Sequence, residues 1–126
     1  MSDFTRRIGP AVDAELTAAS RALRAGDAIG AFDHLERAHV LGQASTLHHV
    51  RVHWRMFLWG LAQRRPGEVL GQMLRLAGAA SKTPFGLVPG GNTGGSNVSP
   101  LRPMHVPADL QRLIDAARGR PPRAGH

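Results

Sequence analysis

Residues 28–62 decide the fold, and they read AIGAFDHLERAHVLGQASTLHHVRVHWRMFLWGLA. Apolar residues recur at spacings of three and four in both halves of this stretch, which predicts two amphipathic helices, over 28–41 and 46–63. The segment Gly42-Gln43-Ala44 interrupts the pattern, and Ser45 is a suitable cap for the second helix because its hydroxyl can accept from a free backbone N–H. A break this short predicts that the two helices are antiparallel neighbours.

The same periodicity continues on both sides of this hairpin. An earlier helix carries an apolar stripe, which consists of Ile8, Val12, Leu16, Ala19 and Leu23. A later helix, whose first turn suits Pro66, carries another, which consists of Val69, Leu70, Met73, Leu74 and Ala77. A short last helix is predicted over 108–117. The sequence therefore predicts an all-α fold of four to five helices in antiparallel hairpins, similar to tetratricopeptide repeats.

The predicted helices form one domain over 1–117, followed by a tail over 118–126 that we expect to be disordered. The segment 81–107 is rich in Gly and Pro and predicts a long loop, which is usually functional when it lies within a compact domain. It lacks the Gly-Lys-Ser/Thr ending of a phosphate-binding loop. We expect an ordered lid that brings Asn92 or Asn97 near a site on the helices, and a flexible connector is the alternative.

The composition excludes several kinds of chemistry. The chain has 126 residues and no cysteine, which excludes disulfides, thiolate zinc sites and cysteine nucleophiles. Its net charge of +7 favours acidic partners, but the bases are scattered and Tyr is absent, which argues against nucleic-acid binding. No stretch approaches the ~18 apolar residues of a membrane span, and no signal segment is visible. The expected location is the cytoplasm, without membrane contact.

Three histidines carry the prediction of a functional site. His39 falls within the apolar stripe of the first hairpin helix, while His49 and His53 are spaced i,i+4 on the second. An i,i+4 pair of histidines is a metal-chelating spacing, because both imidazoles project from one face of the helix. Since His39 and His49 lie at similar distances from Gln43, antiparallel packing brings them to similar heights.

Two carboxylates complete the predicted ligand set. Glu36 forms a Glu-x-x-His pattern with His39, as in carboxylate metal sites of helical bundles. Glu15 and Glu36 are separated from Gly26 by nearly the same number of residues, which brings them to similar heights in an antiparallel hairpin. Glu15 is therefore predicted as a fifth ligand or a supporting group. Imidazole and carboxylate together suit zinc, iron, manganese or copper, with zinc or iron favoured. Because ligating imidazoles must be neutral, affinity should fall between about pH 7 and pH 5.

The same residues permit another interpretation. The inward histidines and acids could satisfy one another by hydrogen bonds in a non-catalytic, tetratricopeptide-like interaction module that binds a protein partner or a second copy of the chain. His48 is expected to point away from His49 and His53. No catalytic residue is assigned by spacing, so metal handling and a metal-dependent reaction both stay open.

Three motifs together resemble a known family. HLERAHVLGQ (34–43), HVRVHWRM (49–56) and GNTGGSNVSP (91–100), with the following Pro103-Met104, resemble the small bacterial family catalogued as domain of unknown function 3703. The resemblance runs from about residue 15 to residue 117. It implies a small cytoplasmic protein whose motif residues are Glu36, His39, His49, His53, Asn92 and Asn97. Some members lie near metal-resistance genes, and no catalytic role is assigned in the family.

Overall fold

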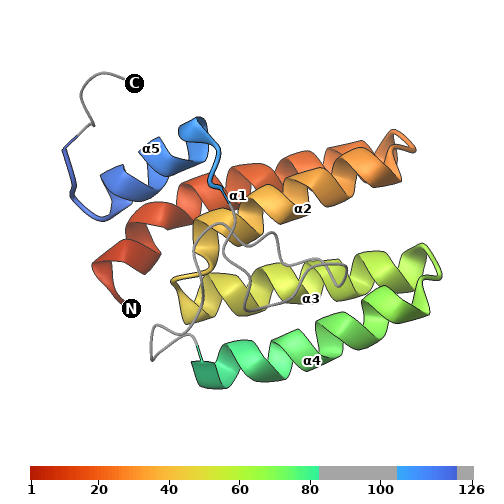
Figure 1. Ribbon diagram of the computed structural model, residues 1–126. Helices are drawn as coiled ribbons and strands as arrows, with labels where there is room; N and C mark the ends of the chain where they lie inside the picture. Colours follow the sequence, from red (N-terminus) through yellow and green to blue (C-terminus); the bar gives the residue numbers. More distant parts are fainter. Residues whose placement is uncertain (83–104, 122–126) are drawn as a thin grey trace.

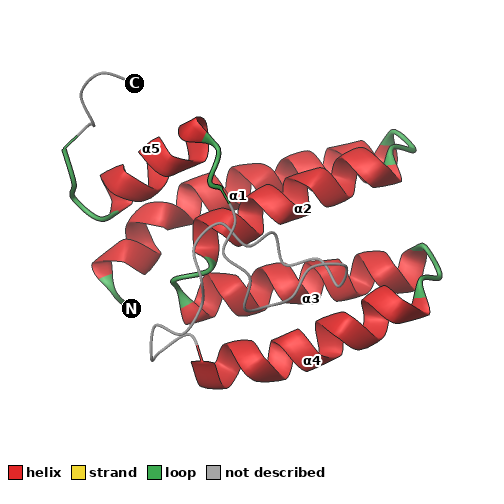
Figure 2. Ribbon diagram, viewed as in Figure 1, coloured by secondary structure: helices red, strands yellow, loops and turns green. Residues whose placement is uncertain are grey.

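The computed structural model describes residues 1–82 and 105–121, with side chains placed for 1–76 and 105–121. These residues form helices and turns only (Figure 2). The helices are α1 (Asp3–Arg24), α2 (Ala28–Gly42), α3 (Thr46–Ala62), α4 (Pro66–Lys82) and α5 (Ala108–Ala117). The all-α prediction is confirmed. Helix α4 extends to Lys82, into the start of the predicted 81–107 loop, and the rest of that loop up to residue 104 lies outside the described residues.

Side-chain caps set where the first three helices begin. The side chains of Ser2, Asp27 and Ser45 accept from the backbone N–H groups of Thr5, Gly30 and His48. Each cap satisfies one of the donors that an α-helix leaves free at its N-terminus. The capping role predicted for Ser45 is therefore confirmed. Gly26 ends the α1 turn with a φ of 82°, a left-handed conformation that glycine adopts at low cost.

Four helices form two antiparallel hairpins stacked on each other, α1 with α2 and α3 with α4 (Figure 1). Helix α3 also contacts α2 and α1, and α5 packs beside α1 and α2. The core between these helices is aliphatic, with Val12, Ala31, Leu35, Leu41, Val52, Met56 and Leu110 among its most buried members. The stripe predicted for α1 is confirmed at Ile8, Val12, Leu16 and Ala19, but Leu23 in its last turn is exposed. On α2, Ala31, Leu35 and Ala38 are buried, as the periodicity predicts.

Helix α4 is rotated relative to the prediction, which placed its apolar stripe inward. Leu70, Met73 and Leu74 are 60%, 55% and 68% exposed, whereas Gln72 is fully buried. Among the described elements, α4 contacts α3 alone. The helix therefore presents a polar side chain to its partner and leaves leucine and methionine at the surface. The buried side chain of Gln72 bonds to the imidazole of His53 on α3.

None of the helices in the described ranges is long and apolar enough to span a membrane. At the C-terminal end, Arg120 still donates its backbone N–H to the carbonyl of Asp115, and the predicted tail beyond residue 121 lies outside the described residues.

Candidate metal centre

The structure brings His39, His49 and His53 together between α2 and α3. Their side chains are only 2%, 6% and 2% exposed. One potential ligand nitrogen from each lies within 4.8 Å of the other two. The ring centroids are 4.6–4.8 Å apart, so all three imidazoles are in mutual contact. Within the described part of the chain, this is the group of side chains that meets the requirements of a metal site.

Local helix geometry accounts for the convergence. His39 lies in the last turn of α2, and His49 lies in the first turn of α3, on opposite sides of a short connection. His53 follows His49 by four residues, which places both on one side of α3. The number of residues between each histidine and the α2–α3 turn was therefore sufficient to predict that these three imidazoles meet.

Nε2 of His39 and Nε2 of His49 lie 3.0 Å apart, at hydrogen-bonding distance. A hydrogen bond between two imidazole nitrogens needs one N–H donor and one lone pair, so a single proton lies between them. A metal ion at this point would replace that proton.

His53 is held from the other side by α4. Its Nδ1 is hydrogen-bonded to Oε1 of Gln72, and Nε2 of Gln72 donates to Oε1 of Glu68 at 2.7 Å. The rotation of α4 follows from this contact, because a buried imidazole needs a polar partner and an apolar α4 face would offer none. Gln72 and Glu68 were missed by the sequence analysis. The signal for them in the sequence is a glutamate and a glutamine spaced i,i+4 within the mainly apolar first half of α4.

Burial keeps two of the imidazoles neutral. The pKa of His49 is lowered to about 3, first by desolvation and then by repulsion from His53 and Arg75. The pKa of His53 is lowered to about 4, mainly by desolvation, although its hydrogen bond with Gln72 opposes the shift. Both rings are therefore ready to act as ligands at neutral pH. Protons should therefore compete with a metal ion for these two rings only below the range of about pH 7 to pH 5 that the sequence predicts.

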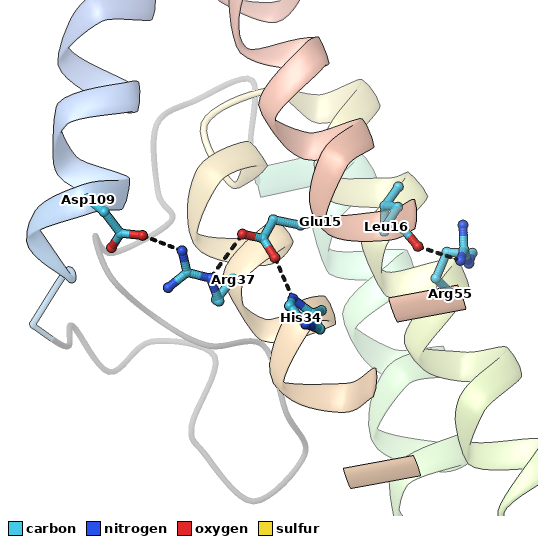
Figure 3. Close-up of polar contacts among 6 residues, drawn as sticks. All are labelled: Glu15, Leu16, His34, Arg37, Arg55 and Asp109. Carbon is cyan, nitrogen blue, oxygen red and sulfur yellow. Dashed lines mark hydrogen bonds and ion pairs between the residues drawn. The ribbon is translucent and has the colours of Figure 1, made fainter. Parts of the chain in front are cut away.

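Glu15 lies in a different polar network (Figure 3). Its Oε2 accepts from Nδ1 of His34 at 2.7 Å, and its Oε1 accepts from Nε of Arg37 at 2.9 Å. Arg37 also bonds to Asp109, so this network links α1, α2 and α5. The structure thus joins Glu15 to α2 side chains and not to the three histidines.

Glu36 is half-buried on α2, one turn before His39. It is not among the three side chains that form the cluster, and it makes interactions of its own. Its role as a ligand stays a prediction.

His48 points away from the cluster, as predicted, and it is buried in the protein. It is 4% exposed, and its Nε2 donates to the backbone carbonyl of Thr5 at 2.8 Å. Arg51 donates to its Nδ1 at 2.9 Å. His48 therefore joins α3 to α1, and α3 packs against α1 as well as against α2 and α4.

The cluster offers three neutral nitrogen donors and no thiolate. Tetrahedral zinc with bonds of ~2.0–2.1 Å needs ligand nitrogens about 3.3 Å apart, so the 3.0 Å pair would open slightly around the ion. Three protein ligands leave one coordination position for water or another ligand.

An all-α fold with three buried, converging imidazoles defines a helical protein with a candidate metal centre. The sequence profile of the family described as protein of unknown function (DUF3703) matches residues 6–114. This protein belongs to that family, as the resemblance of its motifs predicted. No curated protein and no solved structure matches the chain.

Proposed function

We propose that this protein binds one divalent transition metal ion through His39, His49 and His53. The observation that carries the proposal is the approach of three buried ligand nitrogens to within 4.8 Å of one another. Each of the three imidazoles already has a hydrogen-bond partner, and a metal ion is a single partner that all three could share in addition.

Neutral nitrogen donors without thiolate favour zinc, with iron, manganese and copper as the other candidates. We propose Glu36 as the carboxylate available for the fourth position, because it lies one turn before His39 on α2. A site with an exchangeable fourth ligand suits metal handling in the cytoplasm or a metal-assisted reaction.

Elemental analysis tests the proposal. The protein is purified without a histidine tag, stripped with a chelator, reloaded with zinc, iron, manganese or copper, and passed through a desalting column. The expected result is about one metal per chain. Metal retained at far less than one per chain with all four ions would contradict the proposal.

A second candidate function is a protein-interaction module. It is favoured by the apolar surface of the α3–α4 hairpin, where Leu61, Leu70 and Met73 line a hollow of about 410 Å³ together with Arg64 and Arg65. Arg64 and Arg65 are the charged side chains in this lining, and both are basic. A partner segment with apolar and acidic side chains fits this surface.

A photo-crosslinking amino acid at position 74 tests this second candidate in cells. A discrete crosslinked product that disappears with Leu70→Glu supports an interaction surface. The absence of any product, or a product unaffected by Leu70→Glu, would contradict it.

A further inference from the structure

We propose that Glu68 and Gln72 of α4 act as a relay that holds His53 in the tautomer protonated on Nδ1, so that its Nε2 lone pair is free for the metal. Gln72 is then a positioning residue for the site. The inference rests on the proposed metal binding, but it also makes a claim about the metal-free protein.

The hydrogen-bond chemistry allows one orientation of each group. An ionised carboxylate only accepts hydrogen bonds, so the amide group of Gln72 must turn its NH₂ toward Oε1 of Glu68, 2.7 Å away. Oε1 of Gln72 then faces Nδ1 of His53, and a carbonyl oxygen also only accepts. Nδ1 must therefore carry the proton, which leaves Nε2 of a neutral ring with a lone pair.

The placement of Gln72 supports this role. Its side chain is fully buried, while Leu70, Met73 and Leu74 on the same helix are exposed. Turning those apolar side chains inward would bury more hydrophobic surface, so the observed rotation of α4 forgoes that gain. With the observed rotation, Gln72 instead forms the hydrogen bond with His53.

A donor bond from the second ring nitrogen is the usual support of a metal-ligating histidine. It sets the tautomer and ring orientation and raises the basicity of the ligating nitrogen, and its loss typically costs 10–100-fold in metal affinity. In this site the support would come from α4, whereas the ligands come from α2 and α3.

Two variants test the relay. Gln72→Met keeps the side-chain volume but removes the acceptor. The double variant Glu68→Gln with Gln72→Glu exchanges the two groups and preserves the chain of bonds, because the new amide can donate to the new carboxylate, whose free oxygen accepts from His53. Gln111→Met is the matched control, since Gln111 donates to Asp115 at the same i,i+4 spacing on α5, with a distance of 2.9 Å.

The first measurement is the tautomer of His53 by long-range ¹H–¹⁵N NMR in the metal-free protein. Wild type, the exchange variant and Gln111→Met should show the Nδ1–H form, and Gln72→Met should lose it. The second is zinc affinity by competition with a chromophoric chelator. Gln72→Met should bind about 10–100-fold more weakly, and the exchange variant should recover most of that loss.

The outcomes separate the two proposals. An Nε2–H tautomer in wild type, or zinc affinity of folded Gln72→Met within twofold of wild type, would overturn the relay. A wild-type protein with the expected tautomer but no zinc binding would overturn the proposed function and with it the positioning role. If Gln72→Met does not fold, the exchange variant decides: the Nε2–H form in that variant would overturn the relay, and the Nδ1–H form would support it.

Discussion

His39 and His49 face each other through their Nε2 atoms, 3.0 Å apart, although they come from different helices. The proton shared between them lies where a metal ion would lie. Among the described residues, Oε1 of Gln43 is the one buried side-chain polar atom without a hydrogen-bond partner. The histidines thus have hydrogen-bond partners in the metal-free protein, and metal binding would replace the bond between His39 and His49 while keeping the one between His53 and Gln72.

Because of this internal satisfaction, the protein should fold without metal and gain stability when metal binds. Zinc at about 100 times its dissociation constant should raise the free energy of unfolding by about 2.7 kcal/mol. Denaturant titrations with zinc and with a chelator measure the difference. A chelated protein that is unfolded would show instead that metal is required for the fold.

Removing a ligand should abolish tight binding and leave the fold intact. His49→Gln and His53→Gln should each weaken zinc binding by more than about 100-fold, beyond the cost of losing a supporting hydrogen bond. His105→Gln is the control, because His105 is exposed. Chelator competition measures the affinities, and equal losses in all three variants would refute the assignment.

His48→Ala should lower the stability of the fold and leave zinc binding largely unchanged. It removes a buried hydrogen bond to the carbonyl of Thr5 and should cost about 1–3 kcal/mol of stability. Zinc affinity should stay within a few-fold of wild type, since His48 is not part of the cluster. Thermal unfolding and a zinc titration on the same sample check both statements. A stable variant that no longer binds zinc would contradict them.

The metal-free protein should lose stability as the pH falls. The folded-state pKa values of His49 and His53 are lowered to about 3 and about 4, whereas the unfolded chain takes up these protons near pH 6.5. Their contribution to the free energy of unfolding is therefore complete above about pH 6.5. It declines between pH 6.5 and pH 3–4, by at most about 1.4 kcal/mol per pH unit for each ring. Urea unfolding of wild type and of His49→Gln across this range measures it. A decline of the same steepness in both proteins would argue against the assigned shift.

The rotation of α4 predicts which apolar residues tolerate change. Leu74→Ser should alter the free energy of unfolding by less than about 0.5 kcal/mol, because Leu74 is exposed. Leu35→Ala, in the core, should cost about 2–5 kcal/mol. Comparable losses in the two variants would mean that the α4 stripe is covered.

The bounds of α2 and α3 and the convergence of the three histidines could be predicted from the sequence. Helix periodicity and caps gave α2 and α3 to within one residue, because those signals are local. Position along a helix can also be counted from a turn, so the meeting of His39 with His49 and His53 followed from residue numbers.

The rotation of each helix about its own axis could not be predicted from residue numbers. Glu15 was expected as a fifth or supporting group of the cluster, and it accepts hydrogen bonds from His34 and Arg37 on α2. The apolar stripe of α4 was expected inward, but Gln72 takes that place through a bond with His53, which depends on tertiary packing. Burial of His48 has the same origin, since its partner Thr5 lies on another helix.

Anomalous diffraction at the zinc edge, from crystals of the zinc-loaded protein, locates the metal ion itself. We predict one strong anomalous peak per chain, at ~2.0–2.1 Å from one nitrogen each of His39, His49 and His53. A peak coordinated elsewhere would show that the three imidazoles do not form the metal site, and so would the absence of a peak with the hydrogen bond between His39 and His49 still in place.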